Sequence, residues 1–460
     1  MNSTSLFPYA SREELVKEYV GKSLHDVPCP AVVLDISKLK KNCTSMLEAV
    51  DSLDCGWRAH IKTHKTTELT RLQVGDGPGS ANIVVSTVVE AENIVPILLE
   101  YKNKGRPMNV LYGFPLTAGV VDRLSKVSTD LGPSGLSLMI DHPSQLRSVA
   151  AIYTKTSIPP LIFIKIDMGD RRAGVIPGTE ICSQLVSSVV SLANRGVCIL
   201  HGLYSHAGHS YSSNSQTAAL DYLRQEFEAL LVTSEEVRSA AATKMPLVLS
   251  VGATPTSSAI RSLLLPPTSS EGSSEIAALK ATIEAIRDAG CEIEIHAGVY
   301  TMLDMQQLAT HALPEDKLGW SSVAITILAE IASLYPSRSE SGSPEALLTA
   351  GSLALGREPC KAYPGWGILS PWNRTSFALP NTGPEGYSGW QISRISQEHG
   401  ILTNPGKNDS ELSIGQKVRV WPNHACLAGA GYGWYLIVDG SRGEGKEDEI
   451  IDVWVRWRGW

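Results

Sequence analysis

The chain contains no run of about 18 consecutive apolar residues, the length that a membrane-spanning helix requires. Its first twenty residues also lack a basic segment followed by an apolar one, so no secretory signal is predicted. We therefore expect neither membrane insertion nor export, and we predict a cytoplasmic location.

Clusters of lysine and arginine are missing as well. The net charge of the 460 residues is −7, and charged residues make up only 19% of them. Because binding to a phosphate backbone needs basic groups gathered on one surface, we expect no nucleic acid partner.

No Cys-x-x-Cys pair occurs among the eight cysteines. In a chain of this length without an export signal, most of them are interpreted as small buried hydrophobic residues in a reducing compartment. Cys426 is treated separately because a histidine stands two positions before it.

Eight short apolar runs recur between residues 57 and 296, alternating with helical patterns. They are Trp57–Lys62, Asn82–Thr87, Asn109–Tyr112, Ser137–Asp141, Leu161–Asp167, Cys198–Ser205, Pro246–Val251 and Glu292–His296. Their continuous apolar cores indicate burial on both faces, as in a parallel sheet covered by helices. No glycine-rich turn follows the first run, which argues against an open doubly wound sheet. The pattern predicts an α/β fold, a (β/α)8 TIM barrel.

After Leu318 the pattern changes to short strands with frequent glycine, proline and tryptophan, which predicts a C-terminal antiparallel β domain. The predicted boundaries are 1–29 for an N-terminal extension, 30–318 for the barrel and 319–460 for the β domain. Within that domain, the polar stretch Ser337–Pro344 predicts an exposed loop.

Polar residues follow seven of the predicted strands at their carboxyl ends, where barrel enzymes place their active sites. Lys62 closes the first strand, and His60 and His64 lie on the same side of an extended chain. A lysine that forms a Schiff base needs a desolvated, partly cationic setting of this kind. Lys62 is therefore a candidate cofactor lysine, although most lysines are ordinary surface residues.

Two later loops carry residues that suit a phosphate group. Ser250–Thr256 follows the seventh strand, and His296–Tyr300 follows the eighth. Barrels commonly place a phosphate at these two loops, where backbone N–H groups converge and glycine permits close approach. Each loop alone could equally be a tight turn. The loop Tyr204–Tyr211, after the sixth strand, could contact a flat heteroaromatic ring or simply cap the next helix.

His424 and Cys426 would project from the same face of an extended segment. Imidazole plus thiolate suits Zn²⁺, and two protein ligands leave positions open, as a catalytic zinc requires. Since the pattern is short and common, a buried cysteine beside a core histidine is the simpler interpretation of these two residues alone.

Together these motifs resemble the eukaryotic-type D-serine dehydratases, which are related to D-threonine aldolases and more distantly to alanine racemase. The segments that carry the resemblance are Pro30–Asp35, Arg58–Lys65, Val85–Glu92, Leu111–Gly113, Ile140–Pro143, Lys165–Val175, Tyr204–Tyr211, Ala350–Ala354, Ser396–Gly400, Pro422–Cys426 and Val453–Trp460. The resemblance implies a fold-type III pyridoxal-phosphate enzyme with an alanine racemase-like barrel.

By this resemblance Lys62, rather than Lys65, would bind pyridoxal 5'-phosphate as a Schiff base. Arg172 matches the position whose guanidinium approaches the phenolic oxygen of the cofactor. Other cofactor and phosphate contacts would come from Tyr204, Tyr211, Thr254, Gly298, Val299 and Tyr300. The family often has asparagine where Val299 stands and a hydroxyl residue where Ala253 stands, so both substitutions could weaken cofactor binding.

His424 and Cys426 match the zinc ligands of the family, and His399 is a candidate for a third. The resemblance implies β-elimination of D-serine to pyruvate and ammonia, with Lys62 removing the α-proton and zinc binding the β-hydroxyl. It also implies a homodimer.

Two alternatives remain from the sequence. One is D-threonine aldolase-type cleavage of D-3-hydroxy amino acids, including D-threonine; that family tends to have a carboxylate where Cys426 stands. The other is a non-catalytic pyridoxal-phosphate carrier. Such carriers are single-domain chains, so the residues after Leu318 argue against this alternative.

Overall fold

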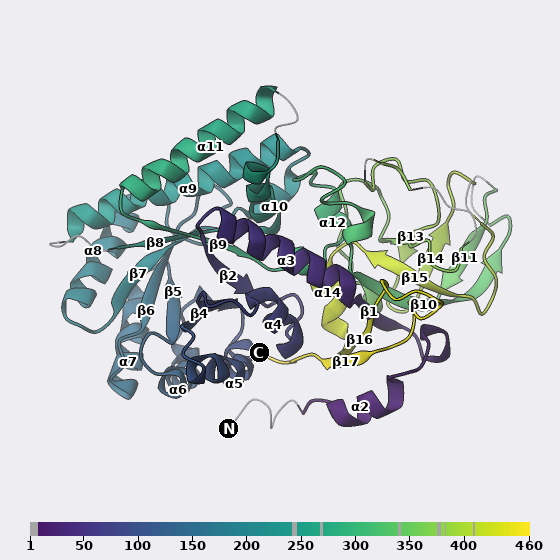
Figure 1. Cartoon of the computed structure of the whole chain (residues 1–460), viewed down its shortest axis with the longest axis horizontal. Helices are drawn as coiled ribbons and strands as arrows, with labels where there is room; N and C mark the ends of the chain where they lie inside the picture. The colour runs from purple at the N-terminus through teal and green to yellow at the C-terminus, as the bar shows by residue number, and fades with distance from the viewer. Residues whose placement is uncertain are drawn as a thin grey trace. The chain divides into compact units, whose positions relative to one another are not determined.

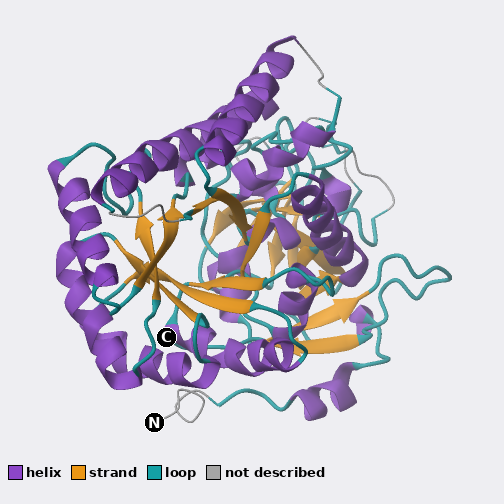
Figure 2. Cartoon of the chain, turned by 60° about the vertical axis from the view of Figure 1, so that its left-hand side comes forward, coloured by secondary structure: helices purple, strands orange, loops and turns teal. Residues whose placement is uncertain are grey.

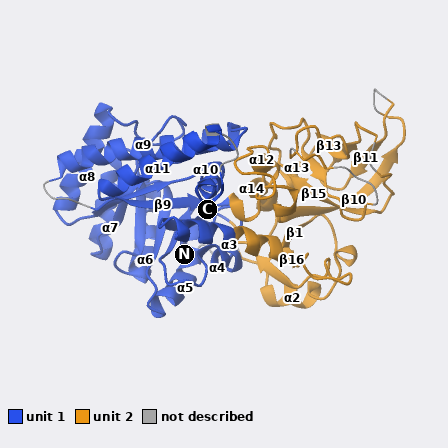
Figure 3. Ribbon diagram, turned by 45° about the horizontal axis from the view of Figure 1, so that its top comes forward, with its two compact units in different colours: residues 1–3, 44–298, 459–460 blue, residues 4–43, 299–458 orange. Residues whose placement is uncertain are grey.

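The structure, a computed structural model, describes residues 8–241, 246–266, 270–338, 342–374, 379–381, 383–407 and 410–460. It contains two compact units (Figure 3). The first contains residues 44–298 and the last two residues, and the second contains the N-terminal segment up to Cys43 and residues 299–458. These units differ from the predicted boundaries at 29 and 318, because the N-terminal segment belongs to the β-rich unit.

The first unit contains a closed barrel of eight parallel strands, which confirms the predicted (β/α)8 fold (Figure 1). The strands are β2 (Gly56–His60), β3 (Ala81–Val85), β4 (Met108–Pro115), β5 (Leu136–Ile140), β6 (Leu161–Lys165), β7 (Ile199–Tyr204), β8 (Val248–Val251) and β9 (Glu292–Ala297). β9 pairs in parallel with β2 and closes the ring, with Arg58 opposite His296. Each strand lies on one of the predicted apolar runs.

Helices surround these strands (Figure 2). They are α4 (Thr67–Val74), α5 (Val88–Asn103), α6 (Val121–Leu131), α7 (Leu146–Thr156), α8 (Glu180–Asn194), α9 (Gln216–Ala240), α10 (Thr254–Ala259) and α11 (Ser270–Asp288); α3 (Ile36–Ser52) includes the boundary between the units. The side chain of Thr87 accepts the backbone N–H of Glu90 and caps α5 directly after β3. Helix α5 therefore begins three residues after the end of β3. The residues between the two elements lie at the carboxyl end of the strand, at the mouth of the barrel.

The barrel interior combines an apolar cluster with a buried ion pair. The cluster consists of Val84, Leu111, Met139, Phe163, Tyr204 and Val248. Arg58 is fully buried, and its Nε donates to Oε1 of Glu294 at 2.7 Å while Nη1 donates to Oδ1 of Asn109 at 2.8 Å. Since an unpaired buried charge is strongly destabilising, Glu294 is what allows Arg58 to lie inside the barrel.

A nine-stranded sheet forms the core of the second unit. Its order is β11 (Glu345–Leu348), β14 (Gly400–Thr403), β13 (Gln391–Ile395), β12 (Gly367–Leu369), β15 (Lys417–Pro422), β10 (Ile325–Tyr335), β1 (Ala31–Asp35), β16 (Trp434–Val438) and β17 (Asp452–Val455). β1 pairs antiparallel with β10 and parallel with β16. The β domain is therefore antiparallel, as predicted, except where this strand from near the N-terminus enters it.

The helices of the second unit are α2 (Arg12–Tyr19), α12 (Met305–Leu308), α13 (Ser352–Leu355) and α14 (Ala425–Ala428). Part of the predicted loop Ser337–Pro344 lies outside the described residues. Among the described residues, no helix has both the length and the apolar character that a membrane crossing requires.

Candidate active site

Lys62 lies two residues beyond the end of β2, at the carboxyl end of the barrel. Its backbone N–H donates to Nδ1 of His60 at 3.5 Å, and Nε2 of His60 lies 3.4 Å from Oγ of Ser86, directly after β3. These contacts connect the turns that follow the first two barrel strands. The side chain of Lys62 is half-buried there.

The neighbouring Lys65 has a different environment. Its Nζ lies 3.0 Å from Oε1 of Glu90, and Oε2 of this α5 carboxylate accepts the backbone N–H of Ser86. Because Glu90 is fully buried, loss of the lysine would leave a buried carboxylate without its counter-charge. Lys65 therefore forms a structural ion pair.

Positive groups gather around two half-buried imidazoles at this mouth. Burial, followed by the charges of Lys62 and Arg172, holds the pKa of His60 and of His206 well below its usual range. Burial also lowers the pKa of Lys165, the last residue of β6, to about 7. A mouth with neutral imidazoles and several cationic groups is suited to an anionic ligand.

Arg172 is positioned by a loop that Asp167 orders. Oδ1 of Asp167 accepts the backbone N–H of Gly169 at 2.9 Å and that of Arg171 at 3.0 Å. Arg171 adopts a left-handed conformation with φ of +55°, which turns the chain sharply before Arg172. The guanidinium is exposed, yet it lies close enough to influence both His60 and His206.

Tyr204 and His296 form a stacked pair inside the mouth, with ring centroids 4.0 Å apart and planes at 11°. Nζ of Lys165 lies 4.8 Å from the centre of the Tyr204 ring. Oγ of Ser250 donates to Oε1 of Glu294 at 2.8 Å and lies 3.0 Å from Nδ1 of His296. The Tyr204 ring thus packs on protein groups, which leaves its hydroxyl as its main means of contacting a ligand.

Glu226 on α9 connects the loops that follow β7 and β8. Its Oε1 accepts the backbone N–H groups of Ala207 at 2.9 Å and Gly252 at 3.2 Å, and its Oε2 accepts the hydroxyl of Thr256 at 2.8 Å. The side chain is fully buried, and burial raises its pKa to about 7. One carboxylate therefore holds two of the loops in which ligand contacts were predicted.

Glycine is required where two of these loops approach their neighbours. A Cβ at Gly252, where φ is +150°, would lie 2.0 Å from the carbonyl oxygen of His296. A Cβ at Gly298 would lie 2.9 Å from the carbonyl oxygen of His60. Both distances are too short for any side chain, so these loops can pack closely only with glycine.

The other predicted contact residues divide between the two units. Tyr211 lies in the short helix Gly208–Ser212 after β7, and Thr254 is buried at the start of α10. Val299 and Tyr300 begin the second unit, in the short helix Val299–Thr301, and both are buried.

His424 and Cys426 lie together at the start of α14 in the second unit. Burial alone would lower the pKa of His424, but its hydrogen bond to Cys426 and the charges of Cys426 and Asp304 raise it to about 9. Nδ1 of His424 lies 2.5 Å from Oε1 of Gln306. The imidazole is thus held between a thiol and an amide.

His399 does not join this pair. It lies exposed in the turn between β13 and β14. Within the described part of the chain, no three histidine, cysteine or acidic side chains are arranged so that they could share a metal ion. The His424–Cys426 pair therefore offers two protein ligands.

Comparison with known proteins identifies the family. Residues 34–261 match the family described as "Alanine racemase, N-terminal domain", and residues 324–438 match "Putative serine dehydratase domain". The D-serine dehydratase of Schizosaccharomyces pombe is 35% identical over 100% of this chain and 98% of its own length. The chain belongs to the D-serine dehydratase family.

Two further matches extend this result. The D-serine dehydratase of Saccharomyces cerevisiae is 32% identical over 97% of this chain and 100% of its own length. The solved structure of D-threo-3-hydroxyaspartate dehydratase from Delftia sp. HT23 has a TM-score of 0.71 at 23% identity, covering 95% of this chain and 100% of that one. The chain is therefore a lyase with an alanine racemase-like fold.

The D-serine dehydratase family and this fold imply pyridoxal phosphate as cofactor. The barrel mouth has polar atoms that suit such a group. Oγ of Ser205, Oγ of Ser210 and Nε2 of His296 are buried and have no hydrogen-bond partner among the described residues. Since buried polar atoms are normally satisfied, these three and the positive charges of Lys62 and Arg172 fit an anionic, heteroaromatic cofactor.

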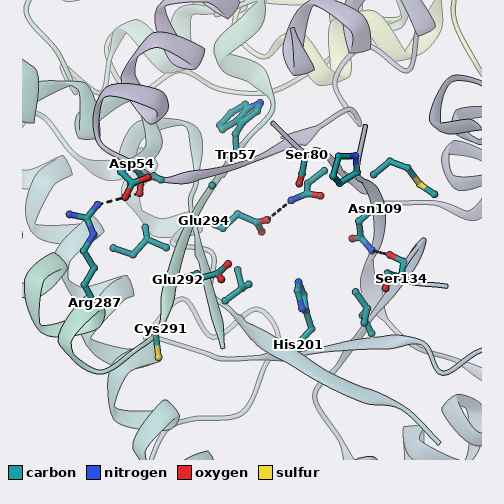
Figure 4. Close-up of a pocket in the computed structure, with 18 residues that line it drawn as sticks. Asp54, Trp57, Ser80, Asn109, Ser134, His201, Arg287, Cys291, Glu292 and Glu294 are labelled. Carbon is teal, nitrogen blue, oxygen red and sulfur yellow. Dashed lines mark hydrogen bonds between the residues drawn. The ribbon is translucent and has the colours of Figure 1, made fainter. Parts of the chain in front are cut away.

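A cavity of about 680 Å³ lies at the opposite end of the barrel (Figure 4). Its lining includes the first residues of several strands, among them Gly56, Met108 and Glu292. Barrel enzymes carry out catalysis at the carboxyl ends of the strands, so this cavity is separate from the site that dehydratases of this family would use.

Sequence reasoning missed Lys165, Glu226 and Gln306. Lys165 ends β6 in the structure, but the predicted strand continued to Asp167, so the rule that selected Lys62 did not single it out. Glu226 stands between the buried Leu223 and Phe227 on α9, a position at which a carboxylate needs partners. Gln306 lies 118 positions from His424, and no local pattern connects the two.

Proposed function

We propose that this lyase converts D-serine into pyruvate and ammonia, with pyridoxal 5'-phosphate and zinc as its cofactors. The environment of Lys62 is the observation that carries the proposal. Lys62 shares the barrel mouth with Arg172 and His206, whereas Lys65 is paired with the buried Glu90. The substrate is inferred from the two yeast relatives, which are D-serine dehydratases.

Lys62 is the proposed Schiff-base residue. Pyridoxal phosphate, when bound, supplies a ring that withdraws electrons and stabilises negative charge at the substrate Cα. Arg172 is proposed to contact its phenolic oxygen. The remaining proposed contacts are Tyr204, Tyr211, Thr254, Gly298, Val299 and Tyr300.

The amine of Lys62 is also the proposed base that removes the α-proton. An amine accepts a proton only in its neutral form, which burial and nearby positive charges favour. The lowered pKa of Lys165 is an instance of this effect at the same mouth. The same lowered pKa makes Lys165 an alternative candidate for the Schiff-base lysine, and a test must distinguish it from Lys62.

His424 and Cys426 are proposed to hold the zinc ion. Imidazole nitrogen and thiolate sulfur are ligands that zinc prefers, and in this structure the two side chains touch. Zinc, when bound, acts as a Lewis acid toward the β-hydroxyl, a poor leaving group. Since D-threonine aldolases tend to have a carboxylate at the position of Cys426, the thiol favours the dehydratase. A homodimer, from the family resemblance, and the cytoplasmic location expected from the sequence complete the proposal.

The proposal is tested by assaying the purified protein with D-serine and with D-threonine, before and after treatment with a chelator. We expect pyruvate from D-serine, loss of that activity on chelation and its recovery when zinc is added. Glycine from D-threonine as the main product would support the aldolase instead. A protein that binds the cofactor but forms neither product would support a carrier, and either result would contradict the proposal.

A further inference from the structure

Gln306, in the first turn of α12, is held by two hydrogen bonds of its side chain and one of its backbone. Its Nε2 donates to the carbonyl oxygen of Pro359 at 2.8 Å, and its Oε1 lies 2.5 Å from Nδ1 of His424. Its backbone N–H donates to the carbonyl oxygen of Asn423 at 3.1 Å. Because a carbonyl oxygen only accepts, the nitrogen of the amide must face Pro359, and the oxygen must face His424.

This orientation determines which nitrogen of His424 carries the proton. The amide oxygen of Gln306 can only accept, so Nδ1 of His424 must be the donor. When the imidazole is neutral, its lone pair is then on Nε2. Metal-bound histidines almost always donate their other N–H to an acceptor, which fixes the tautomer and the ring orientation.

The backbone on both sides of His424 is also held. Nδ2 of Asn423 donates to the carbonyl oxygen of Gly365 at 2.8 Å, and the backbone N–H of Ala425 donates to Oδ2 of the buried Asp304 at 2.8 Å. The segment before α14 therefore has little freedom. With its backbone fixed, the contact with Gln306 decides how the ring is turned.

We propose that Gln306 is a positioning residue for the metal ligand His424. It holds the Nδ1–H tautomer, so that Nε2 binds a divalent cation beside the Cys426 thiolate. This inference rests on the metal site proposed above. Because the acceptor is a neutral amide, the imidazole donates less charge than it would beside a carboxylate, and the cation keeps more of its Lewis acidity.

The test measures the zinc dissociation constant of the full chain by competition with a chromophoric chelator. Gln306→Leu keeps the approximate size of the side chain but removes the acceptor, and we expect about 10- to 100-fold weaker binding. Gln306→Glu restores an acceptor and should bind zinc as tightly as the wild type or more tightly. Gln416→Leu is the matched control in the same unit: Gln416 hydrogen-bonds to Ser413 and Asn373, and its replacement should leave zinc binding unchanged.

A second measurement separates positioning from general destabilisation. Nitrogen-15 spectra of the zinc-loaded wild type should show the proton of His424 on Nδ1, and thermal melts should show that each variant is folded. Wild-type zinc affinity in a folded Gln306→Leu variant, or a proton on Nε2, would overturn the inference. The variants His424→Ala and Cys426→Ala then show which proposal is wrong. If they also bind zinc like the wild type, the proposed metal site itself is wrong. If they lose zinc while Gln306→Leu keeps it, the metal site stands and only the role of Gln306 is wrong.

Discussion

The two candidate sites are built in different ways. The barrel mouth draws on loops after β2, β6, β7, β8 and β9, which lie far apart in the sequence. The His424 site occupies one short segment between β15 and α14, held from α12. One site thus depends on closure of the whole barrel, and the other depends on the contacts that hold one short segment within the second unit.

The electrostatics of the two sites differ in the same way. At the mouth, Lys62 and Arg172 act together on the half-buried His60 and His206, so a change in either charge affects both imidazoles. In the second unit, burial lowers the pKa of His424, Cys426 and Asp304 raise it, and Gln306 contacts its Nδ1. We therefore expect changes at the mouth to have several consequences and changes at His424 to have few.

The largest expected effect is that of Lys62→Ala. Loss of the general base alone should lower D-serine dehydration about 10²- to 10⁴-fold. The absorption band of the lysine-bound cofactor should also disappear from the visible spectrum. Zinc binding should stay at the wild-type level, because the proposed zinc ligands are His424 and Cys426. A lowered zinc affinity in this variant would contradict the independence of the two sites.

Two lysine variants serve as controls for this experiment. Lys65→Ala should keep the absorption band but lower the free energy of unfolding, because Glu90 loses its counter-charge inside the protein. Lys165→Ala should keep the band as well. If the band disappears in Lys165→Ala and persists in Lys62→Ala, Lys165 is the cofactor lysine and the assignment is wrong.

Cys426→Ala tests the proposed metal site in the second unit. Removing the thiolate should abolish tight zinc binding, which chelator competition measures. Since Lewis-acid assistance contributes several kcal/mol, dehydration should fall on the order of 10²-fold or more. The cofactor absorption band should remain as in the wild type. Full dehydratase activity in this variant would refute the role of the metal.

The sequence was sufficient to predict those parts of the fold that have strong local patterns. The barrel strands were predicted because their continuous apolar cores mark burial on both faces. β12 spans only Gly367–Leu369, which is too short for a sequence pattern to predict it. The boundary predicted at residue 29 differs from the division into compact units because Ala31–Asp35 pairs with strands about three and four hundred positions later, which no local signal reports.

The same limit applied to the candidate sites. Lys62 and the His424–Cys426 pair were found because each stands in a compact motif. Glu226 was missed because its partners Ala207, Gly252 and Thr256 come together only when β7 and β8 are neighbours in the barrel. Residues that position others depend on long-range contacts, whereas residues that react often lie in short motifs.

Glu226 gives the smallest and most specific prediction. Burial raises its pKa from 4.5 to about 7, so the folded protein binds this proton more tightly than the unfolded chain does. The contribution of Glu226 to stability is therefore most favourable below about pH 4.5. It falls as the pH rises and reaches its lowest value above about pH 7, a total loss of at most about 3 kcal/mol.

Glu226→Gln should remove this pH dependence while keeping the loops together. The amide oxygen can still accept the N–H groups of Ala207 and Gly252, and the amide nitrogen can donate to the hydroxyl of Thr256. Denaturant unfolding of both proteins between about pH 5 and about pH 8 should show the variant gaining stability relative to the wild type as the pH rises. Parallel pH profiles would mean that the proton of Glu226 does not contribute to the pH dependence of stability in this range, which would contradict a pKa of about 7. In that case separate contacts, rather than shared burial and charge, would determine the ionisation of groups at the mouth, as they do at the His424 site.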